Sequence, residues 1–161
     1  MAIADVTVLG AGAFGLSVAW ACARRGAKVQ VIDPGGPGAG ASGGLVGALA
    51  PHAPDQWDEA KAFQFLSLAM AGAFWAEVAS VGGGDPGYAR LGRLQPPADQ
   101  AAVDRAVTRA AAASDLWPGF RWEVTGEPGA FAPVSPAGLW IHDTLSARLS
   151  PRRAVLALVA A

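Results

Sequence analysis

A glycine-rich turn near the N-terminus constrains the fold of this chain more than any other feature. Gly10, Gly12 and Gly15 form a G-x-G-x-x-G motif. The β-branched and apolar run 6–9 predicts a buried strand before the motif, and residues 13–25 are expected to form a helix after it. This motif between a strand and a helix is typical of a dinucleotide-binding βαβ unit.

Each glycine of the motif has its own physical reason. Gly10 lets the chain turn sharply off the strand, Gly12 lets the backbone approach a pyrophosphate, and Gly15 lets the helix lie close to the sheet. The amides of Ala13 and Phe14, at the start of the helix, are then expected to hold phosphate groups with the help of the helix dipole. The alternative is a tight glycine turn without a ligand.

An acid stands where a ribose-binding residue is expected. The second predicted strand, 28–32, ends at Asp33, which follows Gly10 by 23 positions and precedes Pro34. This spacing is close to the roughly 20 residues typical of an acid that binds ribose hydroxyls. A carboxylate there would repel the 2′-phosphate of NADP, so the sequence favours FAD or NAD.

The segment after Asp33 is unusually rich in glycine. Six of the eleven residues 34–44 are glycine and two are proline, which by itself would indicate a linker. The apolar run 45–50 follows directly, and a solvated linker would not carry it. We therefore expect a closely packed loop that approaches a ligand, followed by a short buried segment.

The rest of the chain alternates between expected helices and strands. Within the first helix, an apolar face formed by Phe14, Val18, Ala21 and Cys22 is expected to be buried, and Trp20 and Trp75 are expected in the core. The further expected elements are a helix 56–81 capped by Asp55, a strand 88–95, a helix 97–113 opened by Pro97, strands 121–125 and 139–142, and a helix opened by Ser150 and Pro151.

The last helix has no closing signal. Residues 152–161 remain helical and apolar in pattern, and no second βαβ half follows. We expect an N-terminal piece of a longer protein; a naturally short protein with a frayed tail is the alternative. Exposed Leu156, Leu158 and Val159 are expected to promote self-association or pairing with a missing C-terminal half.

The composition of the chain limits the kinds of partner that it is expected to bind. The 161 residues are 52% hydrophobic and 16% charged, and 12 basic residues nearly balance 13 acidic ones, so neither nucleic acid nor an acidic membrane is an expected partner. A single cysteine and no evident signal peptide favour the cytoplasm. The apolar stretch 62–76 is too short to span a membrane and predicts a buried core helix.

Two stretches resemble a known family. The pattern from Gly10 to Gly26, with Ala19 between them, resembles the extended FAD fingerprint of the glutathione-reductase-like flavoproteins. The stretch 41–51 resembles the flavin-approach loop of the D-amino-acid oxidase superfamily, especially the glycine oxidases. Its matching residues are Ser42, Gly47, Ala48, Leu49, Ala50 and Pro51. Gly43 departs from this pattern, because a bulky residue often follows the serine there, and it puts the substrate in doubt.

The resemblance implies a cofactor, a reaction and a domain organisation. It implies an FAD-dependent enzyme that oxidises the C–N bond of an amine or amino acid and passes the hydride to the flavin. It implies a Rossmann-like part of an FAD-binding domain at 1–84, the start of an α+β substrate domain at 85–148, and a helix returning to the FAD-binding domain at 149–161. The cofactor-binding residues would be Gly10, Gly12, Ala13, Phe14, Gly15, Asp33, Pro34, Ala41, Ser42, Gly47, Ala48 and Leu49.

Two other functions remain open at this stage. One is an NAD-dependent dehydrogenase, although the long glycine-rich loop after Asp33 is untypical of it. The other is a non-catalytic fragment or one half of a split flavoprotein. No catalytic residue and no metal site is expected. His52 is interpreted as a surface or gating-loop residue, and His142 as structural.

Overall fold

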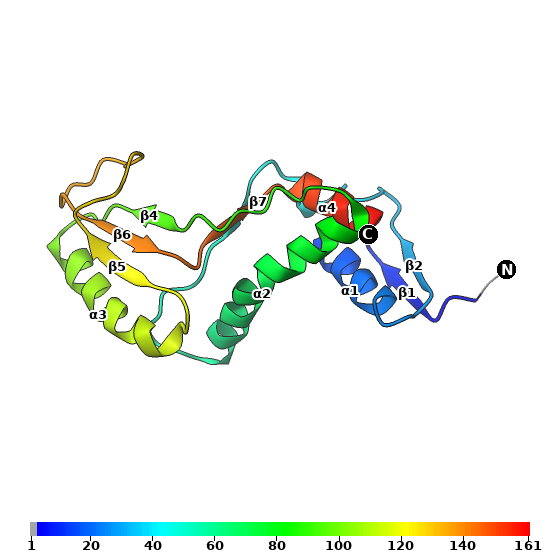
Figure 1. Cartoon of the computed structure of the whole chain (residues 1–161), viewed down its shortest axis with the longest axis horizontal. Coiled ribbons are helices and arrows are strands. Elements are labelled where there is room, and N and C mark those ends of the chain that lie inside the picture. The colour runs from blue at the N-terminus through cyan, green and yellow to red at the C-terminus, as the bar shows by residue number, and fades with distance from the viewer. Residues whose placement is uncertain (1–2) are drawn as a thin grey trace. The chain divides into compact units, whose positions relative to one another are not determined.

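A computed structural model describes residues 3–161 and shows an α/β chain (Figure 1). The α/β class predicted from the sequence is confirmed. In chain order the elements are β1 (Val6–Leu9), α1 (Ala13–Ala23), β2 (Val29–Ile32), the 3-10 turn η1 (Ala41–Gly43), β3 (Gly47–Leu49), α2 (Glu59–Gly82), β4 (Arg93–Gln95), α3 (Gln100–Leu116), β5 (Trp122–Thr125), β6 (Trp140–Asp143), β7 (Ala147–Leu149) and α4 (Pro151–Ala160).

The chain divides into two compact units. The first unit comprises Met1–Gly47, Gly72–Ala89 and Arg148–Ala161, and the second comprises Ala48–Ala71 and Arg90–Ala147. α2 contributes residues to both units. The functional domain boundaries implied by the resemblance stay a prediction.

The first unit is built on a parallel pair of strands. β1 pairs with β2 in a register that sets Val6 opposite Val29 and Leu9 opposite Ile32. α1 packs against both strands and against α4, as Figure 1 shows. Gly15 permits this close approach, because a Cβ there would overlap the carbonyl oxygen of Gly10 and lie 3.3 Å from Val8 Cγ1.

The predicted buried face of α1 is wrong. Leu16, Ala19 and Trp20 are buried, whereas Phe14 is 92% exposed and Val18 is half exposed. α1 is apolar on nearly all sides, so its periodicity could not select a face. The contact of Gly15 with β1 fixes the rotation of the helix instead. Trp20 and Trp75 are buried, as expected.

The second unit joins a three-stranded antiparallel sheet to a helix. β6 lies between β4 and β5, and α3 packs along this sheet (Figure 1). Trp117 and Trp122 meet edge to face with ring centroids 5.8 Å apart. The buried cluster around them consists of Leu68, Ala106, Ala113, Ile141 and Leu145.

Two helices begin later than predicted. Gln56 has a φ of +44°, which is incompatible with a right-handed helix. α2 starts at Glu59, and the Asp58 carboxylate just before it accepts a hydrogen bond from the Lys61 amide at 2.8 Å. α3 starts at Gln100, because Asp99 accepts from the Ala102 amide at 2.8 Å. In both places an aspartate, not the predicted Asp55 cap or Pro97, determines the first turn.

The exposure of several apolar residues differs from the prediction. Leu45 and Val46 are exposed, so the predicted buried segment after the glycine-rich loop is wrong. Leu158 is buried, whereas Leu156 and Val159 are exposed as expected. The strand expected at 88–95 is reduced to β4 and to a single bridge between Ala89 and Arg148.

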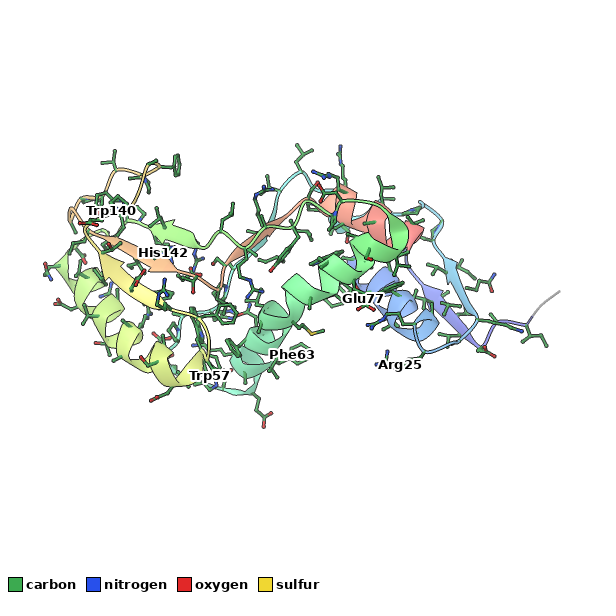
Figure 2. All side chains as sticks on the ribbon, in the orientation of Figure 1. Arg25, Trp57, Phe63, Glu77, Trp140 and His142 are labelled. Atoms are coloured by element: carbon green, nitrogen blue, oxygen red, sulfur yellow. The ribbon has the colours of Figure 1, made fainter. Side chains whose placement is uncertain are left out.

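α2 is apolar but only partly buried. Trp75 and Val78 are buried, whereas Phe63, labelled in Figure 2, is exposed. Hence the predicted buried core helix is buried on one side only. Within residues 3–161, α2 is long and apolar enough to cross a membrane, a test that core helices of soluble proteins also pass.

The stability of the second unit is expected to fall in acid through Asp55. Its Oδ2 accepts from Arg109 Nε at 2.6 Å, and its Oδ1 lies 3.3 Å from Lys61 Nζ. Desolvation raises the pKa of Asp55, but hydrogen bonds and charges from Arg109 and Lys61 outweigh it and lower this pKa below its ordinary value. A lowered folded-state pKa gives stability that is present above the unfolded value of about 3.9 and is lost as pH falls through the folded value.

Asp55→Asn should therefore destabilise the protein more at pH 7 than at pH 3. The expected loss is about 1 kcal/mol or less, since the pair is partly exposed. Urea unfolding at both pH values measures it, with Asp115→Asn, an exposed acid on α3, as the control. An equal loss at both pH values would mean that the ion pairs do not stabilise the fold.

Candidate functional site

The glycine motif forms the turn between β1 and α1. Gly10 has a φ of +107°, in the left-handed region that favours glycine, and its amide donates to the Ile32 carbonyl at 2.8 Å. Gly12 is the N-cap residue of α1. The first amides of a helix have no intrahelical acceptor, so those of Phe14 and Gly15 are available to an anion.

The glycine-rich loop folds closely over this turn. The Gly38 amide donates to the Ala11 carbonyl at 2.9 Å, and Ser42 Oγ accepts from the Ala13 amide at 2.9 Å. A Cβ on Gly12 would lie 3.1 Å from Ser42 Oγ. These contacts hold the loop against the turn although most of residues 34–44 are exposed, and the Ser42 hydroxyl occupies the space beside Gly12. The approach of this loop to a ligand stays a prediction.

Asp33 connects the end of β2 to the same turn. Its Oδ2 accepts from the Ala11 amide at 2.7 Å, and its Oδ1 accepts from the Gly35 amide at 2.8 Å. The hydrogen bond from Ala11 and then that from Gly35 lower the pKa of Asp33, against a smaller effect of desolvation. Asp33 is thus a carboxylate fixed at the C-terminal end of the parallel strands, with lone pairs left for hydroxyl donors.

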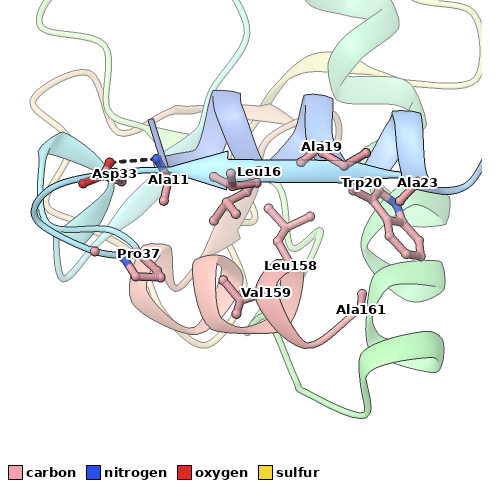
Figure 3. Close-up of a pocket in the computed structure, with 13 residues that line it drawn as sticks. Ala11, Leu16, Ala19, Trp20, Ala23, Asp33, Pro37, Leu158, Val159 and Ala161 are labelled. Atoms are coloured by element: carbon pink, nitrogen blue, oxygen red, sulfur yellow. Dashed lines mark hydrogen bonds between the residues drawn. The ribbon is translucent and has the colours of Figure 1, made fainter. Parts of the chain in front are cut away.

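A pocket of about 320 Å³ opens beside Asp33. Figure 3 shows Asp33 and Pro37 at one end, Trp20 at the other, and Leu16 and Leu158 between them. α1, β2 and α4 supply its walls, which are mainly apolar. One charged group at the end of an apolar pocket is an arrangement suited to a ligand with a planar apolar part and hydroxyl groups.

The structure brings some of the sequence-predicted residues together but not all of them. Gly10, Gly12, Ala13, Gly15, Asp33 and Ser42 surround the turn in the first unit. Phe14, Pro34 and Ala41 are exposed at the surface of the same unit. Gly47 ends the first segment of that unit, whereas Ala48 and Leu49 belong to the second unit.

The two histidines have different surroundings. His52 is exposed, and its amide and Nδ1 lie 2.7 and 2.8 Å from Gln64 Oε1. His142 Nδ1 lies 3.1 Å from Glu123 Oε1 on the neighbouring strand. Glu123 was not predicted from the sequence. Only its position next to Trp122, in a strand whose side chains alternate between faces, could have indicated that its side chain lies on the opposite face of the sheet. Among residues 3–161, no group of three potential metal ligands occurs.

Comparison with known families decides the assignment. The family described as FAD dependent oxidoreductase matches residues 5–161, nearly the whole chain. The chain belongs to this family. The D-amino-acid oxidase and glycine oxidase resemblance seen in the sequence is thereby confirmed.

Solved structures of two oxidases share the fold of this chain. Glycine oxidase from Geobacillus kaustophilus superposes with a TM-score of 0.78 at 20% identity, over 98% of this chain and 43% of that protein. Iminodiacetate oxidase from Chelativorans sp. BNC1 superposes with a TM-score of 0.73 at 26% identity, over 96% of this chain and 43% of that protein.

A curated relative is more similar over a shorter stretch. The tRNA 5-methylaminomethyl-2-thiouridine biosynthesis bifunctional protein of Albidiferax ferrireducens is 53% identical over 53 residues. This match covers 32% of the present chain and 9% of that protein. The chain therefore spans less than half of the glycine oxidase and a small part of the curated relative.

Proposed function

We propose that this chain holds the ADP portion of FAD and forms part of an enzyme that oxidises the C–N bond of an amine or amino acid. The proposal rests mainly on the turn between β1 and α1. Gly12 is followed there by the first amides of α1 and preceded by Ala11, whose amide donates to the Asp33 carboxylate. Membership of an FAD dependent oxidoreductase family supports the identity of the dinucleotide.

The donor and acceptor groups fit a dinucleotide. The pyrophosphate would bind at the amides of Phe14 and Gly15, which begin α1 and have no intrahelical acceptor. The Asp33 carboxylate would accept hydrogen bonds from ribose hydroxyls, and its charge would disfavour a 2′-phosphate. Ser42 holds the loop by accepting from the Ala13 amide, and its hydroxyl would be free to donate to a phosphate oxygen.

The oxidation itself depends on the cofactor. Bound FAD supplies the hydride acceptor, so the protein needs to orient the amine and exclude water. In this proposal Gly47, Ala48 and Leu49 follow the loop toward the flavin ring. The described residues include no acid or base that we assign to the chemical step.

The proposal is tested by the absorption spectrum of the purified protein. The holoprotein should show flavin bands, release FAD on denaturation, and be reduced under anaerobic conditions by an amine or an amino acid. Colourless protein that instead supports NAD-dependent turnover would replace FAD by NAD and overturn the proposal.

A second candidate function has a specific observation in its favour. The 53% identity to a tRNA 5-methylaminomethyl-2-thiouridine biosynthesis protein suggests an amine carried on a tRNA nucleoside as the substrate. The balance of 12 basic and 13 acidic residues gives this chain little attraction for RNA. Flavin reduction by aminomethyl-uridine tRNA, without reduction by free amines or amino acids, would favour this second function.

Asp33→Asn should weaken FAD binding by about tenfold, equivalent to about 1.4 kcal/mol. Asparagine keeps one acceptor for the Ala11 or Gly35 amide but replaces the charged acceptor offered to the ribose. Titration monitored by flavin fluorescence measures the affinity, and Asp115→Asn is the charge-matched control. Equal affinity in wild type and Asp33→Asn would remove Asp33 from the proposed site.

A further inference from the structure

A second cavity, of about 610 Å³, lies within the second unit. Side chains alternate along a strand, so the buried Trp122 on one face of β5 places Glu123 and Thr125 on the other. His142 is the register partner of Glu123 on β6, and these residues line the cavity together. The cavity therefore lies on the sheet face opposite the tryptophan cluster. Figure 2 labels His142 on β6.

The imidazole of His142 has a defined orientation. Its Nδ1 lies 3.1 Å from Glu123 Oε1, and a Cβ on Gly92 would lie 2.8 Å from its Nε2. Gly92 has a φ of +74°, which favours glycine independently of the contact. The ring is thus held between a carboxylate and bare backbone, which is a more constrained position than a solvated surface histidine would have.

The cavity is lined by two carboxylates and by one guanidinium that has its own carboxylate partner. Glu123 and Glu127 contribute carboxylates, whereas the guanidinium of Arg93 is paired with the buried Asp143 at 3.2 Å. Arg121 lies 3.6 Å from the second oxygen of Glu123, but this pair is largely exposed and contributes little. The two lining carboxylates favour a cationic ligand over an anionic one, and no metal-ligand cluster occurs in the described part of the chain.

Large apolar side chains stand beside these carboxylates. Leu91 is 70% exposed and Phe131 is 83% exposed, and both line the cavity. An aromatic ring and a carboxylate are the two protein groups that attract an organic ammonium most strongly. Apolar walls with a few placed polar groups are typical of small-molecule sites.

We propose that this cavity binds an organic ammonium ion. Glu123, oriented by His142, accepts hydrogen bonds from the ammonium group, and Phe131 and Leu91 contact its apolar substituent. The inference rests on the proposed function in one respect, since the ammonium it names would be the amine substrate. Glu123 and His142 are then residues of the second unit that recognise the amine.

The imidazole resonances of the full chain provide the test, because the sequence contains only two histidines. Titration with benzylamine at constant pH should shift the ¹H–¹⁵N signals of His142 saturably and leave those of His52 in place. Benzyl alcohol, the neutral analogue, should bind at least tenfold more weakly. Glu123→Gln should weaken benzylamine binding about tenfold, and Asp115→Asn should leave it unchanged.

An unshifted His142, an equal response to benzyl alcohol, or unaltered affinity in Glu123→Gln would each overturn the inference. FAD affinity measured on the same protein separates it from the proposed function. FAD binding without benzylamine binding rejects the ammonium site alone. Benzylamine binding without FAD binding rejects the proposed function, and the ammonium site stands.

Discussion

Replacement of Gly15 by alanine is expected to destabilise the first unit and to weaken FAD binding at least a hundredfold. A Cβ at this position would overlap the carbonyl oxygen of Gly10 and lie 3.0 Å from its carbonyl carbon. Both obstacles are backbone atoms of the turn itself, so no side-chain rotation relieves them. The N-terminus of α1 must therefore move away from β1, and the amides proposed to bind pyrophosphate move with it.

Two opposing effects determine whether Gly15→Ala raises or lowers the stability of the first unit. Alanine is favoured over glycine inside a helix by about 1 kcal/mol. Overpacking of a well-packed core costs about 1–3 kcal/mol, and the rigid backbone neighbours of Gly15 place it at the upper end. We expect a net loss of about 2 kcal/mol of stability, together with a decrease of at least a hundredfold in FAD affinity.

Thermal unfolding and flavin-fluorescence titration measure both effects of Gly15→Ala. Gly40→Ala is the matched control, because Gly40 has no atom within 4 Å of its added Cβ and lies in the same unit. Hydrogen exchange of α1 and β1 locates the change. Unaltered stability and unaltered FAD affinity would show that α1 does not need its close approach to β1.

The sequence predicted the parts of the first unit that depend on local chemistry. The strand before Gly10, the left-handed turn and the acid after β2 each follow from a residue type that few alternatives can replace. The rotation of α1 could not be predicted from its apolar pattern, because Phe14 and Val18 are as apolar as the buried Leu16. The role already assigned to Gly15 was the better guide to the buried face.

Helix starts were predicted less well than helices. More than one residue could begin each helix: Asp55 or Asp58 for α2, and Pro97 or Asp99 for α3. Tertiary contacts that the sequence does not show determine which of them begins the helix. Asp55 is engaged with Arg109, 54 positions away, and cannot also cap α2. β7 went undetected because three residues are too few for a periodicity.

The candidate site was predictable only where a motif exists. Asp33 and Ser42 both hydrogen-bond to the glycine turn, which neither the motif nor the family resemblance indicated, and their contacts with a cofactor stay a prediction. The pairing of Glu123 with His142 depends on the register of β5 against β6. No motif encodes that register, so His142 was interpreted as structural and Glu123 was not considered.

Asp143 holds the end of β6 by three contacts. It is fully buried, its Oδ1 accepts from the Ser146 amide at 2.7 Å, and its Oδ2 accepts from Ser146 Oγ at 3.0 Å. The same Oδ2 lies 3.2 Å from Arg93 Nε, which ties β4 to β6. Removal of this carboxylate would leave a buried amide, a buried hydroxyl and a guanidinium without their acceptor.

Asp143→Ala should therefore destabilise the second unit by about 2–5 kcal/mol, because the Ser146 amide and hydroxyl each lose a buried acceptor at about 1–3 kcal/mol and the partly exposed Arg93 loses its partner. Asp143→Asn keeps an acceptor for Ser146 and removes the charge opposite Arg93, so a smaller loss of about 1.5–3 kcal/mol is expected. Urea unfolding gives the magnitudes, and hydrogen exchange of β4 and β6 locates them. Because Asp143 adjoins His142, the alanine variant should also broaden the His142 imidazole signals. Equal stability of the alanine and wild-type proteins would mean that water replaces the carboxylate, and that the sheet carrying Glu123 and His142 is held by the tryptophan cluster alone.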